Sequence, residues 1–420
     1  MSETKKLSTE AYKGVRDFYP EDEAIQQYLF STMSRAVERF GYARYDASVL
    51  EPSELYKSKG AENEELVNEQ TYTFIDRGDR EVTLRPEMTP TVARMVAARR
   101  RELSFPLRWY SIPNVFRYER PQRGRLREHW QLNVDLFGSS SIEADVEVIA
   151  LAHAILKEFG ATEKDFEIRI GSRTFLNELT ARHRLSEDAA KSLHTLLDRR
   201  AKMMIGEFEV ALKEYGISLG EINAGDVPND VRMILDHLAQ LGITNVRFDP
   251  SIIRGFSYYT GVVFEVFDID PQNNRSLFGG GRYDNLLSLF SDDLVPAVGF
   301  GMGDVTLRDF LEVRGLLPAY TPPAKAYLAI AGSDNGSISD SIALGAMQLA
   351  DELRATGINV AIDFGDRKLG DQIKAADKQH IPFVIVVGAN ELASGTFTVK
   401  ELATGEERTM SRGDLIEGLK

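Results

Sequence analysis

The stretch from residue 112 to residue 137 constrains the fold of this chain more than any other. Five arginines stand there directly before a run in which apolar and polar residues alternate without exception. The apolar members of the run are Trp130, Leu132, Val134 and Leu136, and the polar members between them are Gln131, Asn133 and Asp135. Successive side chains of a β-strand point to opposite faces, so the run predicts a strand with one apolar and one polar face.

A second alternating segment, Val115 to Arg120, precedes this strand, and Pro121, Gln122 and Gly124 supply turn-forming residues between the two. We therefore expect an antiparallel hairpin with a long basic loop at its tip. Its polar face would carry Arg117, Glu119, Gln131, Asn133 and Asp135. Guanidinium groups bind phosphate and carboxylate in a planar, bidentate geometry, which favours an anion-binding surface over a half-exposed hairpin with solvated charges.

The distribution of charge supports a selective site. The net charge of −14 argues against a non-specific binder of polyanions. Residues 91 to 127 reverse this sign, because they contain ten arginines and two glutamates. An acidic protein with one basic face suits a selective nucleotide or nucleic-acid enzyme, and it suits equally a protein that binds only small anions.

Length and composition exclude several classes of protein. A chain of 420 residues, 43% hydrophobic and 27% charged, predicts two or three soluble globular domains. No stretch approaches the roughly 20 apolar residues of a membrane helix, so no membrane partner is expected. The absence of cysteine excludes disulfides, thiol nucleophiles and thiolate zinc sites, and it fits a cytoplasmic setting. The six histidines show no paired ligand spacing, so we expect no zinc.

The first part of the chain predicts helices and hairpins in alternation. Apolar residues at helical spacing indicate helices over residues 21–40 and 142–159, and residues 70–84 read as a hairpin. A further helix is expected to begin near Thr91. Glu87 stands between two prolines just before it, so its backbone is held on both sides; it is either a functional carboxylate or a simple turn or capping residue.

A change of pattern divides the rest of the chain. Residues 176–245 are rich in helical segments and contain no convincing strand, so we expect a helical insertion there. Strand patterns resume at Val246, and a proline-containing stretch at residues 318–325 reads as a linker to an α/β segment. The predicted fold is α+β. Its domains are one formed by residues 1–175 and 246–320, the insertion at 176–245, and an α/β domain at 321–420.

Three glycine-containing motifs follow the insertion, at residues 254–261, 278–284 and 299–304. We expect the triple glycine of the second motif to form a turn or bulge between strands, where a ligand can approach the backbone. The third motif is not a dinucleotide fingerprint, since that pattern needs a further glycine where Asp304 stands. A GxxxxGK[ST] phosphate loop is absent as well.

Taken together, these motifs resemble the histidyl-tRNA synthetases, a class II family of aminoacyl-tRNA synthetases. The likeness runs in order through the whole chain: R-P-E at residues 85–87, F-R-x-E-R at 116–120, R-G-x-x-Y-Y-T-G at 254–261, G-G-G-R-Y-D at 279–284 and G-F-G-M-G at 299–303. It implies an antiparallel-sheet catalytic domain, a helical insertion and a C-terminal anticodon-binding domain. Residues 40–52 resemble the motif that forms the dimer interface, which implies a homodimer.

The resemblance also implies a reaction. L-Histidine would be activated with ATP, which is bound with Mg²⁺ as the substrate complex, to histidyl-adenylate and then transferred to the 3′ end of tRNA(His). No bound organic cofactor is implied. Arg117 and Arg254 would be catalytic, and Arg117, Glu119, Arg125 and Arg254 would bind ATP. The histidine-binding residues would be Glu87, Thr89, Gln131, Asp135, Tyr258 and Tyr259.

This sequence departs from the family pattern at four places. Asp135 replaces a glutamate that is one methylene longer, His129-Trp130-Gln131 replaces F-H-Q, and Phe256-Ser257 replaces L-D. Thr306 stands where the third motif has an arginine. Arg308, two residues later and about 200° around a helix, is a poor substitute, so the loop arginines would have to hold the outer phosphates.

The alternative function is that of a non-catalytic paralogue, the regulatory subunit of ATP phosphoribosyltransferase in histidine biosynthesis. Such paralogues typically lack the C-terminal domain and have lost catalytic arginines. This chain keeps Arg117, Arg254 and residues 326–420, which favours the enzyme. A translation-related sensor without catalytic activity is a third interpretation that no residue pattern favours.

Overall fold

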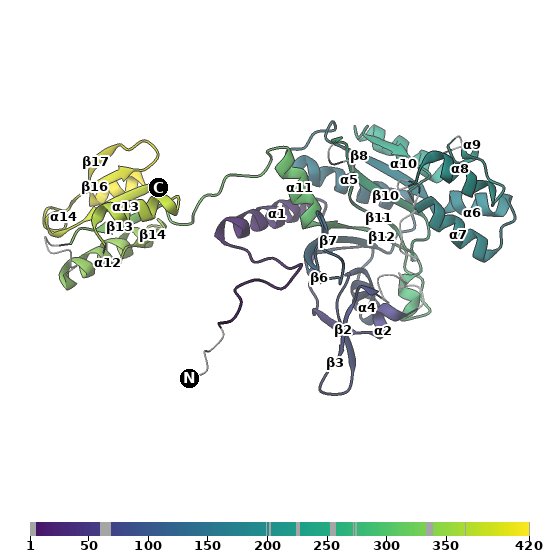
Figure 1. The fold of residues 1–420 in the computed structure, drawn as a ribbon, viewed down its shortest axis with the longest axis horizontal. Helices are drawn as coiled ribbons and strands as arrows, with labels where there is room; N and C mark the ends of the chain where they lie inside the picture. The colour runs from purple at the N-terminus through teal and green to yellow at the C-terminus, as the bar shows by residue number, and fades with distance from the viewer. Residues whose placement is uncertain are drawn as a thin grey trace. The chain divides into compact units, whose positions relative to one another are not determined.

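A computed structural model describes residues 6–58, 69–198, 200, 203–223, 227–252, 258–271, 273, 275–332, 339–365 and 367–419. The chain forms two compact units, residues 1–318 and residues 319–420. Each unit has its own sheet and its own helices (Figure 1), which confirms the predicted α+β fold class. Within the described residues, no helix combines the length and the apolar character that crossing a membrane requires.

The first unit is built on a nine-stranded sheet in the order β1-β5-β7-β12-β11-β10-β8-β9, with β6 paired to β7. Its pairings are antiparallel except at the two edges, where β1 pairs with β5 and β8 pairs with β9 in parallel. The strands are β1 Ala43–Arg44, β5 Leu107–Ser111, β6 Asn114–Phe116, β7 Glu128–Phe137, β8 Phe166–Ser172, β9 Val246–Phe248, β10 Val262–Asp268, β11 Ser276–Arg282 and β12 Ala297–Gly303.

The alternating run is the centre of this sheet, because β7 pairs with β5 on one side and β12 on the other. Leu132, Val134 and Leu136 are buried in the main hydrophobic core. Three helices, α1 Pro20–Arg39, α5 Ile142–Glu158 and α11 Asp304–Val313, cover this face; they lie together beside the sheet in Figure 1. The polar residues of the run therefore face the opposite side, as the alternation predicts.

The predicted hairpin is confirmed, but its first strand is shorter than expected. β6 pairs with β7 from Asn114 opposite Trp130 to Phe116 opposite Glu128. Beyond Phe116 the backbone leaves the strand, because the Glu119 N–H turns back to the carbonyl of Arg117 and the Tyr118 N–H bonds to the carbonyl of Gln70. Arg117 and Glu119 thus project from a loop.

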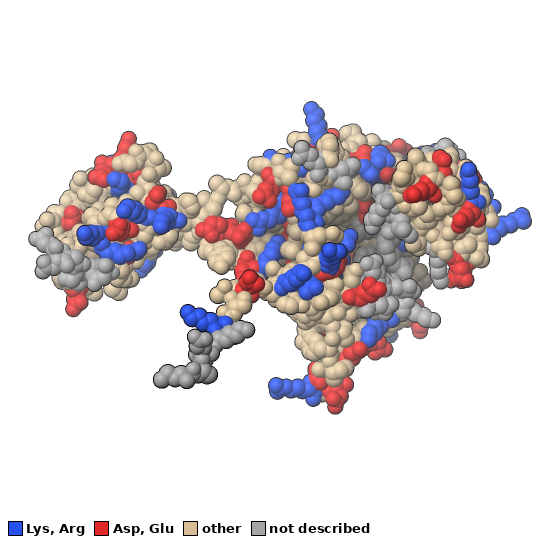
Figure 2. Space-filling view, viewed as in Figure 1, with Lys and Arg blue, Asp and Glu red and all other residues tan. Residues whose placement is uncertain are grey.

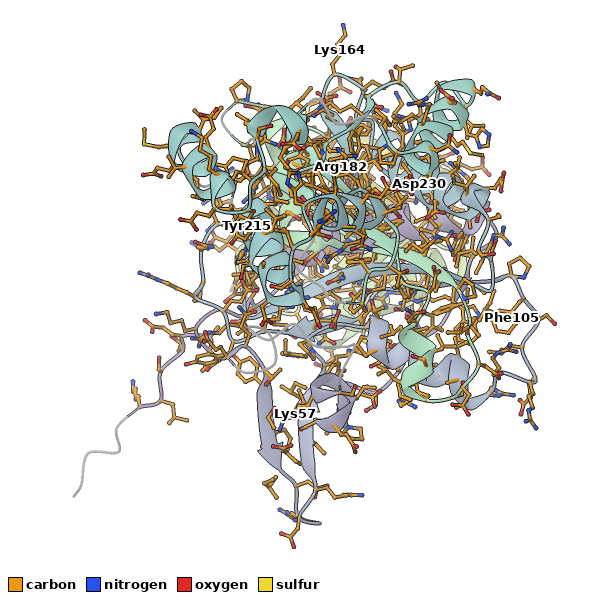
Figure 3. All side chains as sticks on the ribbon, turned by 90° about the vertical axis from the view of Figure 1, so that its right-hand side faces the viewer. Lys57, Phe105, Lys164, Arg182, Tyr215 and Asp230 are labelled. Atoms are coloured by element: carbon orange, nitrogen blue, oxygen red, sulfur yellow. The ribbon has the colours of Figure 1, made fainter. Side chains whose placement is uncertain are left out.

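A small sheet beside the main one is formed by β2 Leu50–Pro52, β3 Tyr72–Ile75 and β4 Glu81–Leu84. The β3–β4 hairpin projects from the unit next to α2 Glu54–Lys57, whose labelled Lys57 is seen in Figure 3. Lys57 Nζ lies 2.7 Å from Glu81 Oε2 and so ties α2 to β4. Helix α4 Thr89–Ala98 follows β4 and begins two residues earlier than predicted. It packs against the short 3-10 helix η2 Leu286–Leu289.

The helix-rich segment contains α6 Arg173–Arg182, α7 Glu187–Asp198, α8 Ile205–Lys213, α9 Leu219–Asn223 and α10 Asn229–Gln240. The first four enclose a small core that includes Phe175, Leu193 and Phe208. Helix α10 is different, because its Val231, Ile234 and Leu238 belong to the main core and it packs on α5. The bounds 176–245 stay a prediction; the helices themselves run from Arg173 to Gln240.

The second unit has a five-stranded sheet in the order β14-β13-β15-β16-β17. The first three strands are parallel and the last two antiparallel. Its elements are β13 Ala326–Ile330, α12 Asp340–Ala355, β14 Val360–Ile362, α13 Leu369–Lys378, β15 Phe383–Val387, α14 Ala389–Ser394, β16 Thr396–Glu401, β17 Glu407–Ser411 and α15 Arg412–Gly418.

A buried carboxylate joins distant parts of the first unit. Asp304, at the start of α11, is 1% exposed. It accepts hydrogen bonds from Arg16 Nη2 (2.7 Å), from Gln26 Nε2 (3.2 Å) and from the backbone N–H of Trp130 (3.0 Å). The negative charge also lies at the positive end of the helix dipole. One side chain thereby fixes the N-terminal segment, α1 and α11 against β7.

The expectation of a turn or bulge at the triple glycine is wrong, because Gly279–Gly281 pair in continuous register within the inner strand β11, and the register shift of its pairing with β10 lies between Val266 and Phe267. Gly280 lies opposite Phe300 of β12, and a Cβ on Gly280 would lie 2.0 Å from the carbonyl oxygen of Gly299. On Gly281 it would lie 2.6 Å from the carbonyl oxygen of Val262. Glycine is required here by the close approach of neighbouring backbones and not by a turn.

This packing predicts that Gly280→Ala destabilises the first unit by about 2–4 kcal/mol, since the new methyl group would overlap backbone atoms that cannot move aside independently. Denaturant unfolding measures the effect. Gly206→Ala is the matched control, because no atom lies within 4 Å of a Cβ there, and helical alanine is favoured over glycine. Equal midpoints for both variants would show that β11 and β12 are not packed as described.

Candidate active site

The polar face of the main sheet holds a pocket of ≈ 380 Å³ lined by residues from β7, β12, β11 and β10 and from the loops above them. It collects nine residues that the sequence predicts for the site: Glu87, Thr89, Arg117, Glu119, Arg125, Gln131, Asp135, Tyr258 and Tyr259. They come from segments up to about 170 residues apart in the chain. Arg254, the tenth, lies outside the described residues.

Glycines form the floor of this pocket. In β12, Gly303, Gly301 and Gly299 stand opposite Gln131, Asn133 and Asp135 of β7. A Cβ on Gly301 would lie 1.9 Å from Gln131 Nε2, and one on Gly299 would lie 2.6 Å from Asp135 Oδ1. The space that side chains would fill on a sheet of ordinary composition is therefore left for the polar groups of β7 and for a ligand.

Asp135 lies at the deep end of the floor. It is 3% exposed, and the hydroxyl of Tyr283 donates a short hydrogen bond to its Oδ1. Its Oδ2 has no hydrogen-bond partner among the described residues. Burial raises the pKa of the carboxyl to about 7, against the lowering effect of the Tyr283 hydroxyl. A buried, half-satisfied carboxyl of this kind is suited to accept a hydrogen bond from a polar ligand.

A second buried carboxyl, Glu87, lies beside Arg117. The Tyr258 hydroxyl donates to Glu87 Oε2 at 3.2 Å, and the backbone carbonyl of Pro86 accepts from Arg117 Nε at 2.9 Å. Burial raises the pKa of Glu87 to about 7, while the charge of Arg117 and the Tyr258 hydroxyl lower it. The backbone between the two prolines thus presents a carboxyl and orients a guanidinium at one corner of the pocket.

His129 also lines the pocket. Its ring is held neutral, because burial, Arg117 and Arg16 lower its pKa to about 3. Its Cδ2 lies 3.9 Å from the position of a Cβ on Gly303. A neutral ring next to a cationic corner adds a flat surface to the pocket without adding charge.

The loop arginines lie at the mouth of the pocket and differ in their contacts. Arg125 Nη1 lies 3.4 Å from Glu119 Oε2, and both residues line the pocket. Arg127 points away from it, since its guanidinium stacks on Tyr118 at 4.0 Å and donates to the Tyr12 hydroxyl at 3.1 Å. The backbone N–H of Arg127 also bonds to the carbonyl of Gly14, so the N-terminal segment braces the base of the loop.

Thr306 and Arg308 of α11 follow the expectation from the sequence. Thr306 lines the pocket, and its hydroxyl donates to the carbonyl of Leu277 at 2.8 Å. Arg308 Nη2 binds Asp22 of α1 at 2.7 Å and does not line the pocket. The cation missing at position 306 is not replaced by its neighbour on the helix.

The expectation of a single basic face needs correction. Six of the ten arginines pair with acidic residues, four of which lie outside residues 91–127: Arg94 with Glu51, Arg99 with Glu102, Arg100 with Asp293, Arg108 with Glu147, Arg123 with Asp309 and Arg125 with Glu119. On the side shown in Figure 2, basic and acidic side chains of the first unit are interspersed. The sequence count did not show these partners, because most of them lie far away in the chain.

Sequence reasoning missed several lining residues, notably Glu265, Phe278 and Tyr283. Tyr283 was inside a recognised motif, but only the fold shows that its hydroxyl reaches Asp135. Glu265 was detectable, because it is the one charged residue among the otherwise apolar residues 262–267. In the part of the chain that the structure describes, no group of three or more His, Cys, Asp or Glu side chains is placed to hold a metal ion.

Comparisons with known proteins agree with this architecture. A family model described as histidyl-tRNA synthetase matches residues 14–215 and 203–305, and one described as anticodon binding domain matches residues 330–420. A histidine--tRNA ligase of Leptospira biflexa is 40% identical over 99% of this chain and 98% of its own. One of Thermoplasma volcanium is 37% identical over 99% of both chains.

Solved structures give the same result. The histidyl-tRNA synthetase of Nostoc sp. PCC 7120 superposes with a TM-score of 0.78 at 25% identity and covers 99% of both chains. A Bacillus halodurans protein described as an ATP phosphoribosyltransferase regulatory subunit/histidyl-tRNA synthetase gives a TM-score of 0.70 at 26% identity, over 86% of this chain and 93% of its own.

The raised pKa of Asp135 predicts a pH-dependent stability. The carboxyl titrates near 4 in the unfolded chain and at about 7 in the fold. Between these values the unfolded chain releases the proton while the fold retains it, so the free energy of unfolding falls as the pH rises and levels off above 7. In Asp135→Asn this contribution, about 4 kcal/mol in total, is absent. Denaturant unfolding from pH 4 to pH 8 measures it.

The exposed Asp292 provides the control, because Asp292→Asn is expected to keep the profile of the parent protein. If the curves of Asp135→Asn and the parent run parallel over this range, Asp135 is not the buried neutral acid that its surroundings indicate.

Proposed function

Because the chain belongs to the histidyl-tRNA synthetase family, we propose that its pocket makes histidyl-adenylate from L-histidine and ATP. The enzyme is a histidine--tRNA ligase, which transfers the histidyl group to tRNA(His) and releases AMP and diphosphate. The observation that carries this function is full-length similarity to histidine--tRNA ligases at 37–40% identity. It is supported by a pocket that gathers the nine described residues predicted for the reaction.

The chemistry needs two anions to meet. The carboxylate of histidine attacks the α-phosphorus of ATP, the bond to the bridging oxygen of the diphosphate breaks, and diphosphate leaves. The 3′-terminal ribose hydroxyl of the tRNA then attacks the histidyl carbonyl and AMP leaves. No protein nucleophile takes part, so the protein contributes by holding the reactants in line and by neutralising charge.

At the amino-acid end, we assign histidine binding to Glu87, Thr89, Gln131, Asp135, Tyr258 and Tyr259. Glu87 suits the α-ammonium group, whose positive charge would return the buried carboxyl to its ionised form. Asp135 lies at the deep end of the floor and suits the imidazole. Because the site reads the imidazole by hydrogen bonds in a buried place, apolar amino acids should be rejected by about 10⁴-fold or more.

The strands around Asp135 compensate for its side chain being shorter than that of glutamate. Its Oδ1 is held by Tyr283, which leaves Oδ2 for the ligand. Gly299 of β12 stands opposite Asp135, and its missing side chain leaves room for the two groups. The substitution of aspartate for glutamate is therefore compatible with a direct contact to the imidazole.

At the nucleotide end, we assign the α-phosphate to Arg117 and the outer phosphates to Arg125, with Glu119 contributing to ATP binding. Arg117 is oriented by the carbonyl of Pro86 and Arg125 by Glu119. Arg254 is assigned opposite Arg117 from the family motif alone. Mg²⁺ would enter with ATP, and the carboxylates of Glu119 and Glu265 in the pocket fit the one or two protein ligands that such an ion takes.

The C-terminal unit is proposed to bind the anticodon of the tRNA, in keeping with the family model that matches it. A homodimer and a cytoplasmic setting are proposed from the family. The regulatory-subunit alternative is not favoured, because this chain keeps Arg117 in the pocket and carries the whole C-terminal unit.

Histidine-dependent ATP–diphosphate exchange tests the proposed function. The protein should catalyse exchange with L-histidine, and Arg117→Ala should lower the rate about 10²–10³-fold because it removes a preorganised charge at the α-phosphate. Arg254→Ala should abolish exchange and leave the fold intact. Arg120→Ala is the matched control, since Arg120 is exposed on the same loop outside the pocket. A folded parent protein without exchange activity would favour the regulatory alternative.

The division into two units gives another prediction. The hydrophobic clusters of the second unit contain residues 324–419 only, so residues 1–318 keep their cores when the second unit is removed. Such a truncated protein should retain exchange, while charging of tRNA(His) at low tRNA concentration should fall about a hundredfold through loss of the second contact. Equal losses of both activities would contradict a role confined to the tRNA.

A further inference from the structure

A second arginine, Arg275, lies near the end of the pocket that we assign to the outer phosphates, and it is not part of the loop. Arg275 immediately precedes Ser276, the first residue of β11, and Ser276 lines the pocket. The backbone carbonyl of Arg275 accepts from the N–H of Asp268 in β10, so its position is fixed by the sheet. A side chain anchored on the central sheet is held more rigidly than one on the arginine loop.

The Arg275 guanidinium reaches the arginine loop at the mouth of the pocket. Its Nη1 donates to the carbonyl of Arg123 at 3.3 Å, and a Cβ on Gly124 would lie 2.3 Å from that nitrogen. Gly124 lines the pocket, and so does Ser276 on the other side of Arg275. The Arg275 guanidinium therefore lies directly behind the rim of the pocket, where it contacts Gly124, which forms part of that rim.

The partner of Arg275 is on the helix that lacks the expected cation. Arg275 Nη2 makes a short ion pair with Asp309, which is three residues after Thr306 on α11. Residues three apart lie on the same face of a helix. Thr306 itself bonds to the carbonyl of Leu277, two residues after Arg275. Arg275 thus places a positive charge next to the face of α11 that carries position 306, where the family has an arginine.

Asp309 forms ion pairs with two arginines. Arg123 Nε lies 3.4 Å from the same carboxylate oxygen that Arg275 contacts. Two guanidinium groups around one carboxylate leave a net positive charge at this rim. In addition, Arg275 Nε is buried and has no hydrogen-bond partner among the described residues. A phosphate, with more oxygen acceptors than a carboxylate has, could engage both guanidinium groups.

From this arrangement we propose that Arg275 binds the outer phosphates of ATP and supplies the positive charge that Thr306 does not. The inference rests on the proposed function. Asp309 holds the guanidinium beside the pocket until the triphosphate replaces the carboxylate as its partner. Arg275 is then a substrate-binding residue, anchored by the sheet, that works together with Arg125 of the loop.

Three variants distinguish substrate binding by Arg275 from an ion pair with Asp309 that only stabilises the fold. Arg275→Ala should raise the KM for ATP in exchange about 10–100-fold, as expected for loss of charged hydrogen bonds, and leave the KM for histidine unchanged. Asp309→Asn should leave the KM for ATP unchanged or lower it, because it frees the guanidinium. If Arg275 only braces the fold, both variants should be impaired alike.

Arg275→Ala combined with Thr306→Arg should recover part of the lost ATP affinity, since it returns a cation to the same helix face. Inhibition by AMP, which has no outer phosphates, should be the same in Arg275→Ala and in the parent. Unchanged use of ATP by Arg275→Ala, or equal weakening of ATP and AMP, would overturn the proposal. Absence of exchange in the parent would instead reject the proposed function.

Discussion

The site depends on how closely the backbones of β7, β12 and β11 approach one another on the polar face of the sheet. Only glycine permits this approach, because a methyl group on Gly299 or Gly281 would overlap a neighbouring carbonyl oxygen. The absent side chains leave a hollow in the centre of a sheet, where one would otherwise find packed residues. Polar groups on β7 can then be buried without filling the space that a substrate needs.

Burial in this hollow determines the electrostatics of the pocket. Glu87 and Asp135 both lose their solvent, and the pKa of each rises to about 7, but only Glu87 has a guanidinium beside it. The two buried carboxyls thus differ in their surroundings, because a guanidinium lies next to Glu87 while Asp135 accepts a hydrogen bond from the Tyr283 hydroxyl. Arg125, the other arginine that lines the pocket, lies on the loop beside Glu119.

Much of this arrangement could be predicted from the sequence, for identifiable reasons. The alternation at residues 130–136 defined the central strand and its two faces, since a period of two depends only on local geometry. The motifs identified nine of the residues that line the pocket. What failed depended on contacts between distant segments. The triple glycine looked like a turn because the backbones that exclude side chains there belong to β12 and β10. The ten arginines looked like one surface because most of the acidic residues that pair with them lie elsewhere in the chain.

Asp304 illustrates a consequence of this dependence for the synthesis of the protein. Its carboxylate binds Arg16, which is 288 positions earlier in the chain, and β7, which lies between them. A ribosome makes the N-terminal segment first, so that segment must wait for nearly the whole first unit before it gains its buried partner. Closing so large a loop is entropically unfavourable until the intervening strands have paired. The contacts of Asp304 therefore form late, and the part of the apolar face of β7 that α11 covers stays uncovered until α11 has been made.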